Sequence, residues 1–253
     1  MRIPPRFPPA VLPVVLLVVL LVMTSSGCQT TAEKSAALAK KFHRQTIDQH
    51  GLSIARTSRE VRAIETAVVH DANGTAAVVT LRNDASRAFR EVPIAITLTA
   101  PGGRVVYQNN AAGLDPSLTS TSLAAHQTFT WVDDQVGTGA FPATALARVG
   151  EGAADAGTVS AGGPRLAARS VRLVEDPANG TAAQGTVTNH SSVTQRNVVV
   201  FAVARRNGKV VAAGRALLAT VPGGGSSPFQ IFFIGNPSGG KLEVSVPATR
   251  FSR

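Results

Sequence analysis

Two stretches of this chain carry nearly the same sequence. HDANGTAAVVTLRN at residues 70–83 returns as EDPANGTAAQGTVTN at residues 175–189, at a period of about 106 residues. Self-similarity at a fixed period indicates that a structural unit has been duplicated. The segments that follow keep the same order, with REVPIAITLTAPGGRVV in the first copy and RNVVVFAVARRNGKVV in the second. A chain of 253 residues with this repeat predicts two similar domains.

The repeated segments have the pattern of β-strands. Residues 92–98 and 229–233 alternate large apolar side chains with other residues, which is the period of a strand with one buried face. Asn73-Gly74 and Asn179-Gly180 lie between strand-like runs, where an Asn-Gly pair favours a two-residue turn with positive φ. We therefore expect an all-β fold in which each copy opens with a hairpin and holds about six or seven short strands.

Cysteine usage and composition limit how these domains can be stabilised. Cys28 is the only cysteine, so no disulfide can form within the chain. A domain of roughly 85 residues is near the lower limit for stability on packing alone. Aromatic residues make up only 5% of the chain, so the cores must be built mainly from aliphatic side chains and Phe. Contact between the two domains would add stability.

The N-terminus has the three-part order of a bacterial signal peptide. Arg2 and Arg6 precede an apolar run over residues 10–23, and a tail of small residues follows. As a helix the run would rise about 21 Å, short of the ~30 Å hydrocarbon layer, so a permanent membrane helix is the alternative reading. The tail ends in SSGC at residues 25–28, which resembles the bacterial lipobox, with Ser25 where that pattern prefers Leu.

The lipobox resemblance implies that Cys28 receives a diacylglycerol group after the signal peptide is removed. One acyl chain holds a protein only marginally at a membrane, whereas two or three give a stable tether. We therefore expect an exported protein that is anchored through Cys28 to the outer face of a bacterial cell-envelope membrane. An ordinary signal peptide followed by an incidental cysteine is the alternative.

These signals divide the chain into five parts. Leu38, Ala39 and Phe42 have helical spacing in a polar segment, which predicts a short helix in a stalk next to the lipid. The stretch GEGAADAGTVSAGG is rich in Gly and Ala and is typical of a flexible linker. The predicted parts are a signal peptide at 1–27, a tether with a short helix at 28–60, a first β-sandwich domain at 61–149, a flexible linker at 150–163 and a second β-sandwich domain at 164–253.

Both copies share a Val-rich strand after an Asn-containing loop, a Gly turn followed by Lys/Arg-Val-Val, and a late apolar segment with Pro or Gly before Phe. In these features each copy resembles the FxLYD domain, an immunoglobulin-like module common in bacterial lipoproteins. The signature aligns with FAVAR at residues 201–205, which keeps Phe and an aliphatic residue but replaces Tyr and Asp, and with ITLTA at residues 96–100, which keeps Leu and loses the aromatics. The resemblance covers about residues 61–150 and 164–250 and implies two tandem immunoglobulin-like β-sandwich domains at a surface, but no reaction.

Charge is the sequence feature that points most directly to a partner. Without the two arginines of the signal peptide, 23 basic residues stand against 15 acidic ones, a formal charge of +8. Such an excess suits an anionic envelope polymer or lipid head groups. A charge scatter that only keeps the protein soluble is the alternative, and nucleic acid is not expected because stacking aromatics are scarce. The candidate residues for an anionic partner, all in the second domain, are Arg196, Arg205, Arg206, Lys209 and Arg215.

No motif for catalysis or for a cofactor is visible. A nucleophile elbow, paired glycosidase carboxylates and a phosphate-binding loop are all missing from the sequence. No His has metal-ligand spacing to another His or to the single Cys. Asp133 and Asp134 should point to opposite sides of an extended chain, which disfavours a calcium site. Asp71 and Asp176, which precede the two Asn-Gly turns, are expected to accept hydrogen bonds from turn amides.

We therefore expect a non-catalytic envelope lipoprotein without a cofactor. Its two domains would act as a binding, adhesion or scaffold module for a protein or an anionic polymer of the envelope. Exposed strand edges and loops are the expected binding surfaces, because β-sandwiches commonly recognise partners there. A hydrolase has less support.

Overall fold

β-Strands form the regular structure of the described part of the chain. The computed structural model describes residues 52–110, 119–154, 166–177 and 179–248, all within the unit Gln49–Arg253. These ranges contain no helix, and the prediction of an all-β fold is confirmed for them. The predicted signal peptide, Cys28 and the helical part of the tether lie outside the described residues.

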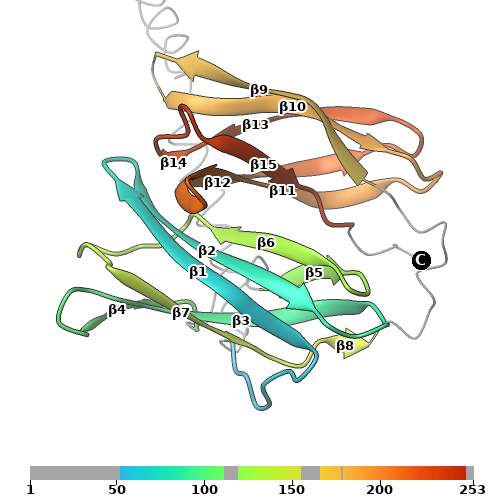
Figure 1. Ribbon diagram of the computed structural model, residues 1–253. Coiled ribbons are helices and arrows are strands. Elements are labelled where there is room, and N and C mark those ends of the chain that lie inside the picture. Colours follow the sequence, from blue (N-terminus) through green and yellow to red (C-terminus); the bar gives the residue numbers. More distant parts are fainter. Residues whose placement is uncertain (1–51, 111–118, 155–165, 178, 249–253) are drawn as a thin grey trace, which may run out of the picture. The chain divides into compact units, whose positions relative to one another are not determined.

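Each copy of the repeat contributes its own strands (Figure 1). The first copy contains β1 (Val61–Asp71), β2 (Gly74–Asn83), β3 (Phe89–Thr99), β4 (Val105–Gln108), β5 (Thr119–Leu123), β6 (Thr128–Asp133), β7 (Thr144–Val149) and β8 (Ala153–Ala154). The second copy contains β9 (Leu166–Asp176), β10 (Gly180–Asn189), β11 (Gln195–Arg206), β12 (Lys209–Val221), β13 (Ser226–Phe232), β14 (Ile234–Gly235) and β15 (Lys241–Ser245).

The two copies pair their strands in the same way. The sheet β1-β2-β6 of the first copy corresponds to β9-β10-β13 of the second. In the other sheet β3 corresponds to β11, and β4 and β5 together take the place of the long strand β12. β7 corresponds to β15, which pairs with the other side of β11. The duplication seen in the sequence is therefore present in the antiparallel pairing of the strands.

The sheets of each copy meet in an apolar, sandwich-like core. Residues 92–98 of β3 alternate between buried and half-buried side chains, as their sequence pattern predicts. Residues 229–233 alternate in the same way between buried and exposed side chains. Trp131, the single tryptophan, is fully buried in the first core, whereas the second core is built from Val, Ala, Ile and Phe.

The repeated Asn-Gly pairs lie in hairpins, as predicted, but the turns differ from the expected type. In the first hairpin Asp71 pairs with Gly74, which leaves a loop of two residues. In the second, Asp176 pairs with Gly180, so the loop is one residue longer. Positive φ falls on the two glycines, at 144° and 86°, and not on the asparagines before them. Glycine takes this conformation because it has no Cβ to clash with the backbone.

The carboxylates before the turns accept hydrogen bonds from turn amides, which confirms that prediction. Oδ1 of Asp71 accepts from the backbone N–H of Asn73 at 2.7 Å, and Oδ1 of Asp176 accepts from that of Asn179 at 3.1 Å. Asp71 has a second role, because its Oδ2 accepts from the backbone N–H of Gly235 at 2.8 Å. The turn of the first copy is therefore bound to the second copy.

A buried asparagine holds the same corner of each copy. Asn83 and Asn189, the last residues of β2 and β10, are each 1% exposed. Nδ2 of Asn83 donates to the carbonyls of Arg87 and Ala124, both at 2.8 Å, and Nδ2 of Asn189 donates to the carbonyl of Val193 at 2.9 Å. Each Oδ1 accepts from the backbone N–H two residues further on, at 3.0 Å. Each buried carboxamide is thus satisfied by backbone groups and ties the end of its strand to the adjoining loops.

The strand register corrects the alignment of the copies that accompanied the family resemblance. The resemblance aligns Ile96 with Phe201, but β3 and β11 begin to pair at Phe89 and Gln195, so Ile96 corresponds to Ala202. Ile96 and Ala202 both belong to the core of their own copy, whereas Phe201 lies in the apolar cluster of the other copy. Because side chains alternate along a strand, a shift of one residue exchanges its two faces.

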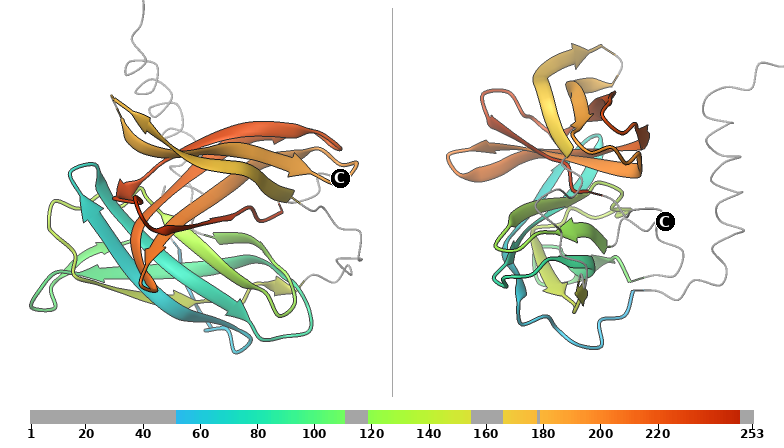
Figure 2. Two further views of the ribbon diagram at one scale, coloured as in Figure 1. Left: turned by 45° about the horizontal axis from the view of Figure 1, so that its top comes forward. Right: turned by 90° about the vertical axis from the view of Figure 1, so that its right-hand side faces the viewer.

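Two sheets from different copies pack against each other. Residues 75–81 of β2 and residues 200–204 of β11 are all buried, so both faces of each strand are covered. Phe201, Val203 and Ala213 of the second copy join the apolar cluster of the first. β1, β2 and β6 lie next to β11, β12 and β14, with one further sheet on each outer side (Figures 1 and 2). The sheets therefore form four stacked layers.

Parts of the predicted tether and linker lie against the first copy. Thr57 forms a β-bridge with Gly150, and the backbone N–H of Ser58 donates to the carbonyl of Val149 at 2.9 Å. β8, within the predicted linker, pairs with β3. The start of the predicted linker therefore extends the first copy, and its residues 155–163 lie outside the described part of the chain.

Candidate functional site

The basic residues predicted to bind an anionic partner do not form one surface. Arg205 and Arg215 lie in the contact between the copies, where their side chains are only 15% and 9% exposed. Arg206 and Lys209 are exposed and lie opposite each other on neighbouring strands, beside the β11–β12 turn. Arg196 is exposed at the other end of β11. The structure therefore separates two junction residues from a basic pair at the turn and from a single distant cation.

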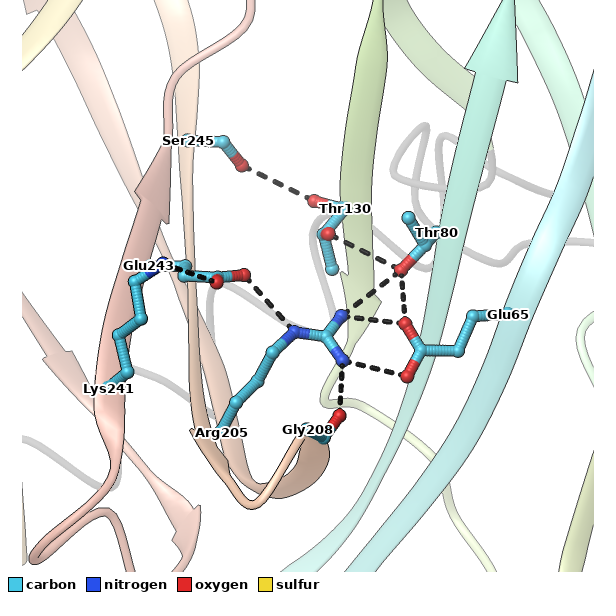
Figure 3. Close-up of polar contacts among 8 residues, drawn as sticks. All are labelled: Glu65, Thr80, Thr130, Arg205, Gly208, Lys241, Glu243 and Ser245. Atoms are coloured by element: carbon cyan, nitrogen blue, oxygen red, sulfur yellow. Dashed lines mark hydrogen bonds and ion pairs between the residues drawn. The ribbon is translucent and has the colours of Figure 1, made fainter.

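Arg205 is the centre of a polar network that joins the copies (Figure 3). Its two terminal nitrogens donate to the two carboxylate oxygens of Glu65 in the first copy, each at 2.7 Å. Its Nε donates to Glu243 on β15 at 3.1 Å. Oγ1 of Thr80 donates to Glu65 at 2.9 Å and completes the same network. A bidentate pair of this kind fixes orientation as well as adding attraction, because the planar guanidinium matches the carboxylate.

The electrostatics of this network favour the ionised carboxylate. The hydrogen bond from the Arg205 guanidinium lowers the pKa of Glu65, against the opposing effect of partial burial. Glu65 follows a bulge in β1, and Arg205 adjoins one in the β11–β12 ladder, so both side chains depart from regular strand alternation. The network acts as a fixed joint between the copies.

Asp134 forms a second polar joint. Its Oδ1 accepts from Nε of Arg215 at 2.8 Å, and its Oδ2 accepts from the backbone N–H of the same residue at 3.0 Å. Asp133 faces the other way and accepts from the hydroxyl of Tyr107 at 3.2 Å inside the first copy. Burial raises the pKa of Asp133. The adjacent carboxylates therefore point to opposite sides, as predicted.

The outer faces of the stack are more polar than the matching inner faces. Val78 pairs with Val132 in the contact between the copies, whereas the corresponding pair on the outer face of the second copy is Gln184 and Gln230. The outer face of the second copy is therefore more polar at this position than the inner face of the first. β3 and β11 can be compared in the same way. Where β11 has Val199, Phe201 and Val203, the outer face of β3 has the smaller or more polar residues Pro93, Ala95 and Thr97.

Two open depressions lie on the described surface. One, of about 580 Å³, lies at the end of the first copy between Arg62 and Arg82. The other, of about 530 Å³, lies on the outer face of the second copy. Its lining residues are Ser170, Arg172, Gln184, Gly185, Thr186, Pro228, Phe229 and Gln230.

The described ranges hold neither a metal-binding cluster nor a membrane-spanning helix. No group of three or more His, Cys, Asp or Glu that could hold a metal ion occurs among the described residues. No helix in the described segments is long and apolar enough to cross a bilayer. His43 and His50 lie outside those segments, and the ring of His70 packs edge-on against Phe141 at 4.7 Å between centroids.

No protein-family model and no curated protein sequence matches this chain. Functional assignment therefore depends on its own residues and contacts. Sequence reasoning found the cations of the second copy but missed Glu65, and it did not foresee that Asp134 and Asp71 bind the second copy from the first. These contacts join residues 140, 81 and 164 positions apart in the chain. No local pattern in the sequence signals these contacts between the copies.

The Arg205–Glu65 pair is expected to couple the stability of the two copies. In a double-mutant cycle with Arg205→Met and Glu65→Gln, we expect a coupling free energy of about 2 kcal/mol, because the pair is bidentate and partly shielded from water. Urea unfolding at pH 7 measures it. The matched pair Arg87–Glu60, which is 57% and 41% exposed, should couple by less than about 1 kcal/mol. Equal coupling in both pairs would contradict a special role for Arg205.

The same joint should weaken in acid. The pKa of Glu65 is lower in the folded protein than in the unfolded chain, so its contribution is complete above the unfolded pKa and is lost as pH falls through the folded one. The stability difference between the wild type and Glu65→Gln should therefore shrink from pH 7 to pH 3. Urea midpoints at both pH values test this, and a difference that stays constant would contradict it.

Proposed function

We propose that this chain is a lipid-anchored envelope protein whose two immunoglobulin-like domains form one rigid, non-catalytic binding or scaffold module. The observation that carries the proposal is the contact between the copies. Two ion-pair joints and a shared apolar cluster hold the copies together. Rigid joints of this kind suit presentation of surfaces at a fixed distance and orientation, which reduces the entropy lost on binding.

The N-terminal sequence supports the location of the module. A short apolar run after two arginines, followed by SSGC at residues 25–28, favours export and lipidation at Cys28. The described chain meets the first copy through the bridge between Thr57 and Gly150. We propose that the intervening segment serves as the stalk.

Replacement of the anchor residue tests this location. With Cys28→Ser, the protein should leave the membrane fraction and appear in the soluble envelope fraction, because no acyl chain can be attached. Cell fractionation and the mass of the mature N-terminus measure the result. Ser26→Ala, which keeps a small residue in the lipobox, is the control and should stay in the membrane fraction. An unmodified thiol on Cys28 in the wild type would refute lipidation.

A second candidate function is retention of an anionic envelope polymer by the second copy. Its support is the exposed pair Arg206 and Lys209 at the β11–β12 turn, with exposed Lys241 on the neighbouring strand β15. Attraction of this kind is screened by salt over about 10 Å at 0.1 M. Polymer retention that survives 1 M salt would therefore contradict it.

A hydrolytic activity would overturn the non-catalytic assignment. The direct test is a panel of ester and glycoside substrates assayed with the full chain. Turnover that disappears on changing a single His or Asp would show that the protein is an enzyme.

A further inference from the structure

We propose that the first copy carries a binding site for phosphate-class oxyanions in the depression formed by Arg62, Arg82 and His126. This site is separate from the basic pair of the second copy. The inference deepens the proposed function, because it names a ligand class for the envelope module. It does not require that Cys28 is lipidated.

The two arginines lie directly opposite each other on neighbouring strands. Arg62 of β1 pairs with Arg82 of β2 in the ladder, and their side chains remain 57% and 53% exposed. Like charges in this position destabilise a sheet, so the fold gains nothing from their juxtaposition alone. The second copy has Ala167 and Thr188 at the corresponding ladder positions, which shows that the strand pairing does not need two cations there.

Asp84 holds the two guanidinium groups in place. Its Oδ2 accepts from Nε of Arg62 at 2.7 Å, and its Oδ1 accepts from Nε of Arg82 at 2.6 Å. The hydrogen bonds from both arginines lower the pKa of this carboxyl, with Arg62 having the larger effect. Within the described residues, no protein group takes the two terminal nitrogens of Arg82. The cluster is therefore ordered in advance and keeps one net positive charge with unused donors.

His126 adds a backbone observation. It has a φ of 56°, in the left-handed region that disfavours a side chain, whereas the matching residue of the second copy is Gly224 with a φ of 65°. The two residues correspond because their backbone N–H groups make the same hydrogen bond. That of His126 donates to the carbonyl of Ala85, and that of Gly224 donates to the carbonyl of Ser191. Histidine thus occupies a position where the other copy uses glycine, and this exposed residue lines the depression. Strain of this kind commonly persists where a side chain serves a function.

The arrangement fits a tetrahedral oxyanion better than a carboxylate. Arg62 and Arg82 on two strands and His126 in a loop line an open volume of about 580 Å³, and Asp84 already supplies a planar carboxylate to the arginines. A phosphate group offers several acceptor oxygens that guanidinium forks recognise. Both a phosphodiester polymer and a phospholipid head group present this chemistry.

Binding to the full-length protein tests the site, in a neutral detergent for the soluble probes and in detergent-free buffer for the vesicles. The probes are inorganic phosphate, a soluble glycerol-phosphate polymer, and phosphatidylcholine vesicles with and without phosphatidylglycerol. Titration calorimetry is used for the soluble probes and co-sedimentation for the vesicles. Arg82→Ala should lower affinity about tenfold or more, since a hydrogen bond to a charged group is lost. Arg87→Ala removes the same charge from an exposed arginine outside the depression and should change affinity less than about twofold.

His126→Gly gives a result that a purely structural role would not. It should raise the melting temperature, because glycine relieves the left-handed strain, and still lower the affinity severalfold. Binding of the polymer alone assigns a wall-type phosphodiester, and binding of anionic vesicles alone assigns a head group. The proposal is overturned if no probe binds, or if Arg82→Ala and His126→Gly bind as Arg87→Ala does. Membrane release of Cys28→Ser is scored separately, so failure of the anchor and failure of this site are distinguishable.

Discussion

Asn189→Ala is expected to lower the free energy of unfolding by about 3 kcal/mol or more. The carboxamide is 1% exposed and donates to the carbonyls of Val193 and Val221 at 2.9 and 3.4 Å. Its oxygen accepts from the backbone N–H of Ser191 at 3.0 Å. Alanine would remove all three hydrogen bonds at a corner that contains the fully buried Val221, and each buried group left unsatisfied costs about 1–3 kcal/mol. Urea unfolding followed by circular dichroism measures the change.

The repeat supplies its own replicate and control for this prediction. Asn83→Ala should have an effect of similar size, because Asn83 makes the corresponding hydrogen bonds in the first copy. Asn73→Ala, in an exposed turn, should cost less than about 1 kcal/mol. If Asn189→Ala is as mild as Asn73→Ala, the buried carboxamide is not what holds the corner.

Gly235→Ala is expected to destabilise the protein by about 3 kcal/mol or more and to loosen the contact between the copies. Gly235 has a φ of 89°, and a Cβ on it would lie 2.3 Å from the carbonyl oxygen of Val211 and 2.5 Å from Cγ1 of Val69. The first contact lies within the second copy and the second crosses to the first copy. Overpacking against backbone and an unsuitable φ both oppose the change. The hydrogen bond from Gly235 to Asp71 should also lengthen.

Gly239→Ala is the matched control for this substitution. Gly239 also has positive φ, at 69°, but a Cβ there would meet nothing within 4 Å. It should therefore show only the conformational penalty of about 1 kcal/mol. Thermal melts of both variants measure the difference, and hydrogen exchange across β2 and β12 reports the contact between the copies. Similar losses for the two variants would show that crowding at Gly235 is unimportant.

The joint between the copies explains how two small aliphatic cores are supported without disulfides. Each copy alone would expose one inner face, and Phe201 and Val203 would then meet water. Burying these side chains removes apolar area at about 25 cal/mol per Å², and the ion pairs fix the orientation. A binding surface on either copy is thereby held in a constant relation to the other copy.

Several features of the fold could be predicted because they depend on residues close together in the chain. The alternation of residues 92–98 follows from the two-residue period of a strand, and the hairpins follow from turn residues between apolar runs. Asp71 and Asp176 accept from amides two and three residues away, which any copy of the motif would do. The opposite directions of Asp133 and Asp134 follow from strand geometry alone.

The sequence by itself therefore determined the duplication, the all-β class and the turn chemistry, since these are set by local spacing. Only the tertiary structure decided that Arg205 binds Glu65 and that Phe201 faces the other copy, because one depends on contact across 140 residues and the other on a register exact to one residue. It also decided that His126 stands where the second copy has glycine. A sequence shows which residues are charged or apolar, but the stacking of the sheets determines which residues they contact.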